Sequence, residues 1–485
     1  MSFFPIAPTT DDRSAKGCVP LVLRNCMVEP QPVGSAKRAR FVISPTPGRT
    51  ARVTPSSGNN VRGVFSRPGV IDGALLAAAG SNLYKIDTSW TATNVGAIGG
   101  VSGDTVLFDS IGANAILLSN GILFQYSDAD GLVQNVDEDF PDSAYTLASL
   151  AERALTSERY SDTFDWSATG TGLSWPASGF AASARMPDEI RSQIVLGGDL
   201  WHFGASSTQV WRAVGGEDVD AFDILSAVQI DRGIAGRDAI AKIDSAAIFV
   251  ADDRVIYLVS GYSIVRISNR EIEQRLAALT TTEFASLQCF SYADGSHLFW
   301  VLRMPSGVSF AYDTFTRMWS ERATWKQPGG VARYAPTYYT YSHQIGKHVV
   351  ASDESDAIWT WDETQFGDAS SPHERVMMVH VPVVARTIIS NITLDLKCTN
   401  VPLSGTGSDP KAQVTLYTDG GSRDSLATRN VERMVSLGGS GSYERRPSIW
   451  RLGLALPADG LLIKVRITDP INFAFSGVWV NENPV

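Results

Sequence analysis

The fold is decided by one short stretch, Asn114-Ala115-Ile116-Leu117-Leu118-Ser119-Asn120-Gly121-Ile122-Leu123-Phe124-Gln125-Tyr126. Its two apolar runs flank Asn120-Gly121, and an Asn-Gly pair between such runs is a strong signal for a tight β-hairpin turn. The second run carries an aromatic residue near its middle. The stretch therefore predicts a hairpin, which cannot be stable alone because two strands bury too little apolar surface.

The same pattern recurs from about residue 60 to residue 365. One copy is 73–86, another lies around 163–166, and the later ones pair 194–196 with 208–211, 247–250 with 255–258, 297–301 with 308–312, and 349–351 with 358–361. The aromatic markers of the copies are Tyr84, Phe124, Trp166, Trp211, Tyr257, Phe310 and Trp359, at spacings of 40, 42, 45, 46, 53 and 49 residues. Blades of a β-propeller repeat with a period of this size.

A propeller explains the repetition because a four-stranded blade buries its faces only against its neighbours. We therefore expect an all-β protein with a β-propeller of six or seven blades at residues 61–367. The alternative is one β-sandwich or a pair of them, which would space strands at roughly 8 to 12 residues without a longer period.

The flanking segments differ from the propeller region. Residues 1–60 are Pro-rich, contain the basic cluster Lys37, Arg38 and Arg40, and are expected to form an N-terminal arm with the first strands, packed on other material. Residues 368–485 show longer apolar runs, at 376–384, 388–397, 413–418, 449–456, 461–468 and 474–480. We expect these runs to form a C-terminal β-sandwich with its own core.

One short helix is expected at 268–279. Ser268 or Asn269 can cap its N-terminus, and acidic residues lie in its first turn. Ile272, Leu276 and Leu279 share one face. The helix would lie between two blades.

Composition narrows the classes of function. A chain of 485 residues suggests two or three domains, and its formal net charge of −10 does not favour a surface that holds nucleic acid by counterion release. Any DNA near it is expected to be contained or passed along. Four scattered cysteines favour a reduced protein assembled in the cytosol, and Met1–Pro5 lacks the features of an export signal. No membrane anchor is expected.

The sequence signals for catalytic or metal-binding sites are weak. His343 and His348 are five residues apart, which is not the helical spacing of a zinc motif, and Cys18 and Cys26 lack a second close Cys or His pair. Solvated loop histidines and buried apolar cysteines are the favoured interpretations.

The acidic and glycine-rich runs are equally weak. Asp128-Ala129-Asp130-Gly131 resembles the start of a calcium loop, but Asp139 stands where the loop needs Glu, so a hairpin turn is favoured. The acidic run Glu217, Asp218, Asp220 and Asp223 is interpreted as a solvated loop. Gly438-Gly439-Ser440-Gly441 lacks the strand and helix of a nucleotide loop. No catalytic, cofactor-binding or metal-binding residue is predicted, and the protein is not expected to be an enzyme.

Two other functions stay open from the residues. A propeller glycan hydrolase or depolymerase would place paired carboxylates at the central mouth. A monomeric propeller scaffold would bind peptides. The fold by itself does not separate these alternatives.

The order of several motifs resembles a known family, the packaged-DNA stabilisation proteins that form the tail nozzle, or hub, of short-tailed bacteriophages. The motifs are Arg24-Asn25-Cys26-Met27-Val28-Glu29-Pro30, Phe41-Val42-Ile43-Ser44-Pro45-Thr46-Pro47-Gly48, Val61-Arg62-Gly63-Val64, Gly80-Ser81-Asn82-Leu83-Tyr84-Lys85, Gly204-Ala205-Ser206-Ser207-Thr208-Gln209-Val210-Trp211, Arg232-Gly233-Ile234-Ala235-Gly236, Ile267-Ser268-Asn269-Arg270-Glu271-Ile272-Glu273, Gly295-Ser296-His297-Leu298-Phe299, 445–453 and Arg466-Ile467-Thr468-Asp469-Pro470. Their order extends over about 450 residues.

The resemblance implies a structural protein of the virion tail, assembled in the host bacterial cytoplasm. It implies a homo-oligomer, a hexameric ring below the portal and its adaptor, which joins after packaging to retain DNA and later conducts it. The implied partners are the portal-adaptor protein, the tail needle or plug, tail fibres or tailspikes, and double-stranded DNA passing without sequence-specific binding. The resemblance supplies no catalytic residue, and no cofactor is implied.

Overall fold

The structure is a computed structural model. It describes residues 2–10, 21–31, 41–101, 103–182, 187–216, 220–326, 330–362, 364–369, 371–382, 388–399, 401–417, 431–438, 447–455 and 460–481. Lys37, Arg38 and Arg40, Cys18, Glu217 and Asp218, and residues 439–446 lie outside the described residues.

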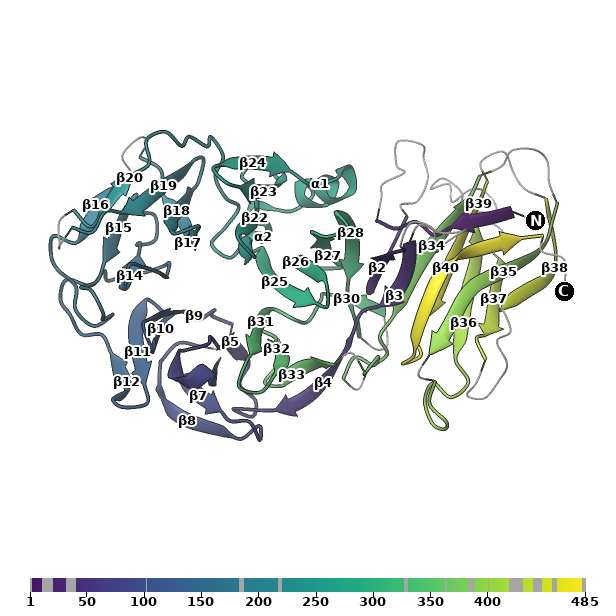
Figure 1. Ribbon diagram of the computed structural model, residues 1–485, viewed down its shortest axis with the longest axis horizontal. Helices are drawn as coiled ribbons and strands as arrows, with labels where there is room; N and C mark the ends of the chain where they lie inside the picture. The colour runs from purple at the N-terminus through teal and green to yellow at the C-terminus, as the bar shows by residue number, and fades with distance from the viewer. Residues whose placement is uncertain are drawn as a thin grey trace.

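Within this described part, seven four-stranded antiparallel sheets form a ring around a central axis (Figure 1). The first four blades are β5 (Val61–Phe65), β6 (Leu75–Ala79), β7 (Asn82–Ile86) and β8 (Ala92–Ala97); β9 (Leu107–Ile111), β10 (Asn114–Ser119), β11 (Ile122–Ser127) and β12 (Gly131–Gln134); β13 (Ala148–Leu150), β14 (Arg153–Thr156), β15 (Thr163–Trp166) and β16 (Phe180–Ala182); β17 (Ile190–Leu196), β18 (Asp199–Gly204), β19 (Thr208–Ala213) and β20 (Phe222–Ile224). The last three are β21 (Ile240–Ile243), β22 (Ala246–Val250), β23 (Ile256–Ser260) and β24 (Ser263–Arg266); β25 (Gln288–Asp294), β26 (His297–Arg303), β27 (Ser309–Asp313) and β28 (Met318–Arg322); and β31 (Tyr338–Ser342), β32 (Lys347–Ala351), β33 (Ile358–Asp362) with β4 (Gly48–Val53). The prediction of an all-β propeller is confirmed.

The blades pack through wedges of apolar side chains contributed by both neighbours. Phe164 of the third blade, for example, lies edge-on to Trp211 of the fourth, with ring centroids 5.1 Å apart. A corresponding cluster joins the first blade to the seventh through Leu75 and Val349. Apolar clusters of this kind lie between all neighbouring blades of the ring.

An N-terminal strand closes the ring. β4 pairs antiparallel with β33, so the last blade takes three strands from the end of the propeller region and one from the segment before it. The chain then enters β5, whose Val61 N–H donates to Ser355 O at 2.9 Å. β4 lies within the range 1–60, and nothing in the sequence pattern indicated its pairing partner.

All seven aromatic markers lie on the third strand of their blades, which explains their regular spacing. One predicted hairpin is wrong. Residues 194–196 do not pair with 208–211, because β18 lies between β17 and β19 and pairs with both. Gly197 and Gly198 adopt positive φ, at 61° and 86°, and turn the chain back directly after Leu196.

The expected helix is confirmed as α1 (Arg270–Ala277), with Asn269 as its cap and Ile272 and Leu276 buried. A second helix, α2 (Thr281–Ala285), was missed. Its signal was present, because Thr280 and Glu283 form a capping box. A short 3₁₀ turn, η2 (Ile71–Gly73), and a two-stranded hairpin, β29 (Thr324–Lys326) with β30 (Gly330–Ala332), complete the propeller region.

Two further sheets share one buried core beyond the propeller. One contains, in order, β2 (Cys26–Pro30), β3 (Phe41–Pro45), β40 (Asn472–Val480), β35 (Ile388–Thr399) and β38 (Ser448–Ala455), with β1 (Ser2–Pro5) also on β40; the other is β34 (Arg375–Val381), β39 (Leu461–Ile467), β36 (Lys411–Tyr417) and β37 (Val431–Ser436). Their core includes Val379, Leu394 and Phe475. Six of these strands match the expected apolar runs, and β37 was missed.

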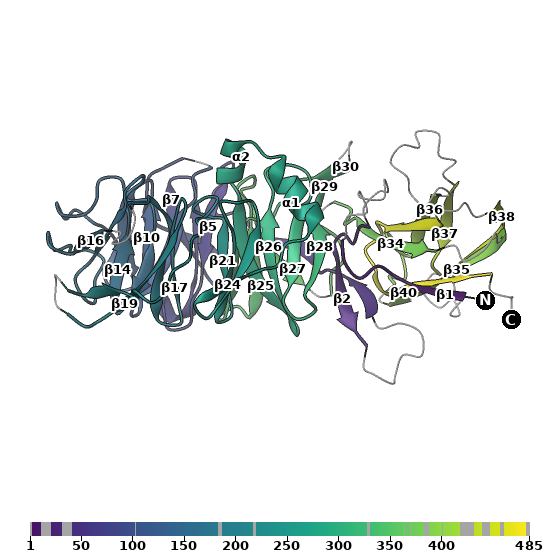
Figure 2. The same cartoon turned by 90° about the horizontal axis from the view of Figure 1, so that it is seen from above.

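The N-terminal arm is shared between the two parts of the molecule, since β1, β2 and β3 belong to the C-terminal sheets and β4 to the propeller. The two views place the C-terminal sheets beside the rim of the ring, next to β28, rather than over its axis (Figures 1 and 2). Among the described residues, no helix has the length and apolar character needed to cross a bilayer.

Candidate functional site

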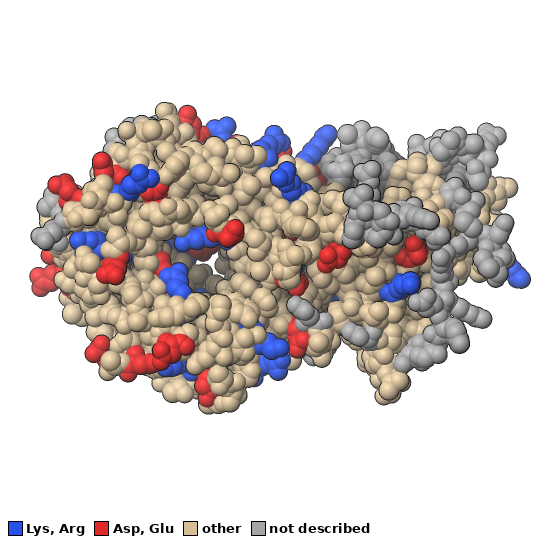
Figure 3. Space-filling view, viewed as in Figure 1, with Lys and Arg blue, Asp and Glu red and all other residues tan. Residues whose placement is uncertain are grey.

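The centre of the ring holds an axial cavity of about 240 Å³, and Figure 3 shows an opening there. Six blades contribute to its wall. The lining residues are Thr105, Leu107, Thr146, Leu147, Ser192, Gln193, Ile194, Arg237, Asp238, Ile240, Gln288, Cys289, Thr337 and Tyr338. Tyr338 of the seventh blade reaches the second blade, where its hydroxyl lies 3.4 Å from Thr105 Oγ1. The cavity therefore belongs to the assembled ring and to no single sheet.

The mouth of the axial cavity lies at the N-terminal ends of the innermost strands and is polar. Arg237 holds Asp238 through two bonds, Nε to Oδ1 at 2.9 Å and Nη2 to Oδ2 at 3.1 Å. The Arg237 guanidinium also lies 4.9 Å from the ring centre of Tyr145. Because the charges of Arg237 and Asp238 compensate each other, this part of the mouth has no net charge.

Below the mouth, one apolar or weakly polar side chain from each of six blades forms what we call the apolar collar. Its members are Leu107, Leu147, Ile194, Ile240, Cys289 and Tyr338. Burial raises the pKa of the Cys289 thiol, so this thiol is uncharged at neutral pH.

A charged layer, made of Arg67, Asp109 and Lys242, follows the collar. Asp109 lies two residues after Leu107 on β9, and Lys242 two residues after Ile240 on β21. Arg67 Nη1 bonds Asp109 at 2.7 Å. Burial lowers the pKa of Lys242, Asp109 opposes this shift and Arg67 adds to it, although β9 and β21 belong to the second and fifth blades. These side chains therefore face each other across the axis.

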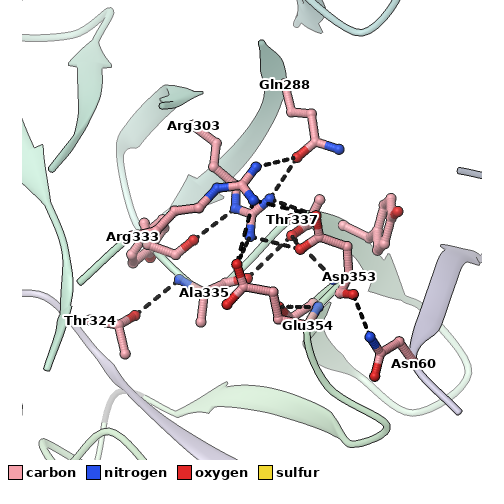
Figure 4. Close-up of polar contacts among 12 residues, drawn as sticks. Asn60, Gln288, Arg303, Thr324, Arg333, Ala335, Thr337, Asp353 and Glu354 are labelled. Carbon is pink, nitrogen blue, oxygen red and sulfur yellow. Dashed lines mark hydrogen bonds and ion pairs between the residues drawn. The ribbon is translucent and has the colours of Figure 1, made fainter. Parts of the chain in front are cut away.

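A polar network joins the sixth and seventh blades (Figure 4), and two of its members, Gln288 and Thr337, line the axial cavity. Arg303 is fully buried and bonds both carboxylate oxygens of Asp353, at 2.7 and 2.9 Å. It also donates to Gln288 Oε1 at 2.6 Å and to Tyr334 O at 2.8 Å. Each donation satisfies a guanidinium N–H that would otherwise be buried without an acceptor.

Further bonds extend this Arg303 network to the seam of the ring. Thr337 Oγ1 donates to Asp353 at 2.9 Å, and Asn60 Nδ2 donates to Asp353 O at 2.8 Å. Although burial opposes it, the pairing with Arg303 holds the pKa of Asp353 below its usual value. The network thus ties the sixth blade, the seventh blade and the start of the first blade together.

The junction between the propeller and the C-terminal sheets depends on the segment around Arg24. Its backbone bonds β28 on one side and β34 on the other, through Glu321 and Val376. The Arg24 side chain pairs with Glu321 at 2.7 Å and with Glu374 at 3.0 Å. Asn25, at φ 50°, donates to Ala323 O and Glu374 O. The two parts are therefore joined by a bonded layer.

His297 forms a second link across this junction. It is 2% exposed, its Nδ1 lies 2.7 Å from Asp313 and its Nε2 lies 3.3 Å from Glu29 on β2. The hydrogen bond to Asp313, together with the charges of Asp313 and Glu29, raises the pKa of His297 to about 9, against the effect of burial. The imidazolium form therefore joins a propeller strand to a C-terminal sheet at neutral pH.

This link predicts a pH dependence of stability. Because the pKa of His297 is raised to about 9 in the folded protein, its contribution is complete below about pH 6.5 and lost as pH rises through 9. We expect the free energy of unfolding to fall by up to about 3 kcal/mol across this window. His297→Gln should flatten the slope in urea titrations at pH 6, 8 and 10. An unchanged slope in that variant would contradict the assignment.

The residues singled out in the sequence do not come together in one site. His343 and His348 both pack against Tyr341, with ring centroids 4.9 Å away in each case, and His348 Nδ1 lies 2.8 Å from the Tyr339 hydroxyl. Among the residues the structure describes, no group of three or more His, Cys, Asp or Glu is placed to hold a metal ion. Cys26 is fully buried, and burial raises its pKa to about 12.

The acidic turn at Asp128 is confirmed as a hairpin turn between β11 and β12. Its Asp128 carboxylate accepts from Lys85 Nζ at 2.6 Å. Asp139 donates its backbone N–H to Asp137. Of the acidic run, Asp220 and Asp223 are exposed.

Sequence reasoning missed the Arg303 network and the axial cavity. A signal for the first existed, because Arg303 ends the otherwise apolar run Leu298-Phe299-Trp300-Val301-Leu302. An arginine in such a position must find a buried acceptor. No comparable signal marked Gln193 or Lys242, whose roles depend on blades far apart in the sequence.

The closed ring and its bonded junction define a propeller with an appended pair of sheets. A family model described as bacteriophage P22 Gp10, beta-propeller, matches residues 9–365. The chain belongs to this family and is a phage structural protein, as the sequence resemblance implied. No curated protein matches the chain.

Several solved structures are similar to parts of this chain. Two are extracellular domains of BT4673 from B. thetaiotaomicron, titled a putative one-component and a putative hybrid two-component system, each 10% identical; they cover 84% of this chain and 48% of theirs, with TM-scores of 0.44 and 0.45. The chain thus spans about half the length of these proteins. A catalytically inactive virginiamycin B lyase from Staphylococcus aureus with quinupristin is 10% identical over 66% of this chain and 98% of that one, with a TM-score of 0.41.

Proposed function

We propose that this chain is a tail nozzle protein that closes the head-to-tail channel of a short-tailed phage, retains packaged DNA and conducts it during ejection. The observation that carries the proposal is the family match over residues 9–365, which includes the arm, the junction segment and the propeller. In this proposal the protein works through its interfaces and performs no chemical reaction.

The size of the axial cavity limits how such a conduit is built. The major and minor grooves of B-DNA are about 8.5 and 7.5 Å deep, and a duplex with grooves of that depth does not fit into a cavity of about 240 Å³. DNA would therefore pass between several copies of the chain, arranged as a hexameric ring, and not through the hole of one propeller. A net charge of −10 suits a wall along which phosphates slide without being held.

The proposed partners follow from the same role. The portal-adaptor protein would lie above the ring, and the needle or plug and the fibres or tailspikes would attach to it, after assembly in the host cytoplasm. The glycan hydrolase alternative gains no support from the described cavity lining, whose one carboxylate, Asp238, is paired with Arg237.

Particles that lack this chain test the proposal. We expect them to package DNA but to lose it on storage, so that the genome becomes accessible to nuclease, and we expect labelled chain to appear at the tail vertex in electron micrographs. Supplying purified chain to such particles should restore nuclease protection. Particles that keep their DNA without the chain, or label found away from the tail, would refute the role.

A further inference from the structure

We propose that the axial cavity is a binding site for an extended peptide segment that carries an apolar side chain followed, two residues later, by a carboxylate. The site goes beyond the proposed nozzle function and does not depend on it. It would receive the segment from a partner chain, end-on, through the polar mouth.

The first support is an unsatisfied buried acceptor. Gln193 lines the cavity and is 5% exposed. Its amide nitrogen donates to Leu155 O at 2.7 Å, whereas its Oε1 has no hydrogen-bond partner among the described residues. A buried carbonyl oxygen without a donor costs free energy, so a ligand that brings an N–H or O–H to this point is favoured.

The second support is the apolar collar, which favours a ligand that carries an apolar side chain. The collar offers mainly Leu and Ile side chains, while polar residues such as Thr146, Ser192 and Thr337 line the same cavity. A lipid chain carries no donor for Gln193. A peptide combines an apolar side chain with a neighbouring backbone N–H, which is the pair of groups that the collar and Gln193 require.

The third support is the charged layer, which sets the sign and spacing of the ligand. Arg67 and Asp109 pair with each other, and Lys242 has no ion-pair partner among the described salt bridges. The layer therefore has two basic groups and one acidic group. Lys242 lies two residues beyond Ile240 of the collar, which is roughly 7 Å along a strand. An extended peptide spans the same distance between residue i and residue i+2.

Access to the mouth agrees with this assignment. The C-terminal sheets lie beside the ring in both views and leave the axis uncovered (Figures 1 and 2). The charges of the paired Arg237 and Asp238 compensate each other, so an uncharged stretch of peptide can pass them. Gln288 and Thr337, which face the cavity, are held by the Arg303 network (Figure 4), so that wall is already ordered before a ligand arrives.

Short peptides test the site on the full-length protein. The probe is N-acetyl-Leu-Gly-Asp amide, and its controls are N-acetyl-Leu-Gly-Lys amide, N-acetyl-Ser-Gly-Asp amide and glucose. The readouts are calorimetric binding and the rate at which methyl methanethiosulfonate modifies Cys289, measured by mass spectrometry. Cys398, a half-buried thiol on β35, serves as the internal reference because it lies outside the ring.

We expect the Leu-Gly-Asp probe to bind and to slow modification of Cys289 without changing that of Cys398. Lys242→Met should weaken binding about tenfold, as expected for a lost hydrogen bond to a charged group, while Lys242→Arg should retain it. Because Lys242 takes part in no described ion pair, neither variant should impair folding. Gln193→Leu should weaken both Leu-containing peptides by a similar factor.

Three outcomes would overturn the proposal. The first is that neither binding nor protection of Cys289 occurs at millimolar peptide, which would leave a water-filled channel. The second is protection by glucose in place of the peptides, which would make the site one for a small polar molecule. The third is equal binding of the Asp and Lys probes in the parent protein, which would remove the role of the charged layer. None of these results bears on nuclease protection of particles, so the nozzle function is tested separately.

Discussion

Trp211→Ala is expected to lower the free energy of unfolding by about 3–5 kcal/mol, the cost of a large-to-small change in a packed core. Trp211 is 5% exposed and lies between the third and fourth blades, where its ring meets Phe164 edge-on. Truncation leaves a cavity that two rigid sheets cannot close. Urea unfolding followed by circular dichroism measures the change.

Trp359→Ala should behave similarly, because Trp359 is 8% exposed and packs between the sixth and seventh blades under the Arg49 guanidinium, 4.8 Å from its ring centre. The matched control is Trp450→Ala on β38, since Trp450 is 48% exposed and its loss should change stability by less than about 0.5 kcal/mol. If Trp211→Ala or Trp359→Ala were as stable as the parent, the blade cores would be misplaced.

Arg303→Leu is expected to cost about 3 kcal/mol, at the low end for breaking a buried ion pair. The substitution leaves the carboxylate of Asp353 without its two-bond partner, although Arg333 remains 3.7 Å away and Thr337 still donates to it. Gln288 Oε1 and Tyr334 O lose a donor as well. The same urea titration reports the loss.

A double variant separates the unpaired charge from lost packing. Arg303→Leu with Asp353→Leu should be less destabilised than the sum of the two single changes, because no buried charge is left alone. Lys85→Met breaks the exposed pair with Asp128 and should cost under about 1 kcal/mol. Strict additivity at Arg303 and Asp353 would mean that the pair does not hold the sixth and seventh blades together.

The hairpin repeat could be predicted from the sequence because its signals are local. Each blade contains a turn such as Asn120-Gly121 and an aromatic residue on its third strand, and both act within about a dozen residues. The same is true of α1, whose cap and apolar face lie within ten residues. The strand β18 was missed although the sequence contains the signal for the turn before it, Gly197-Gly198.

The candidate site could not be predicted from the sequence. Gln193, Ile240 and Tyr338 belong to the fourth, fifth and seventh blades, and each is an ordinary strand residue in its own segment. Their common function as a cavity wall exists only when the ring is closed. The unsatisfied Oε1 of Gln193 likewise becomes an observation only when its surroundings are known.

By itself, the sequence determined the all-β class, the propeller repeat and the family, since periodicity, turn residues and motif order are properties of neighbouring residues. Only the tertiary structure shows that β4 completes the seventh blade, where Arg52 donates a hydrogen bond to Thr360, 308 positions away in the sequence. Only the tertiary structure shows that the arm is divided between the ring and the C-terminal sheets. It alone placed the charged layer across the axis. The physical reason is that a pairing between distant segments is selected by burial in the closed ring, where several weak local preferences must be satisfied at once.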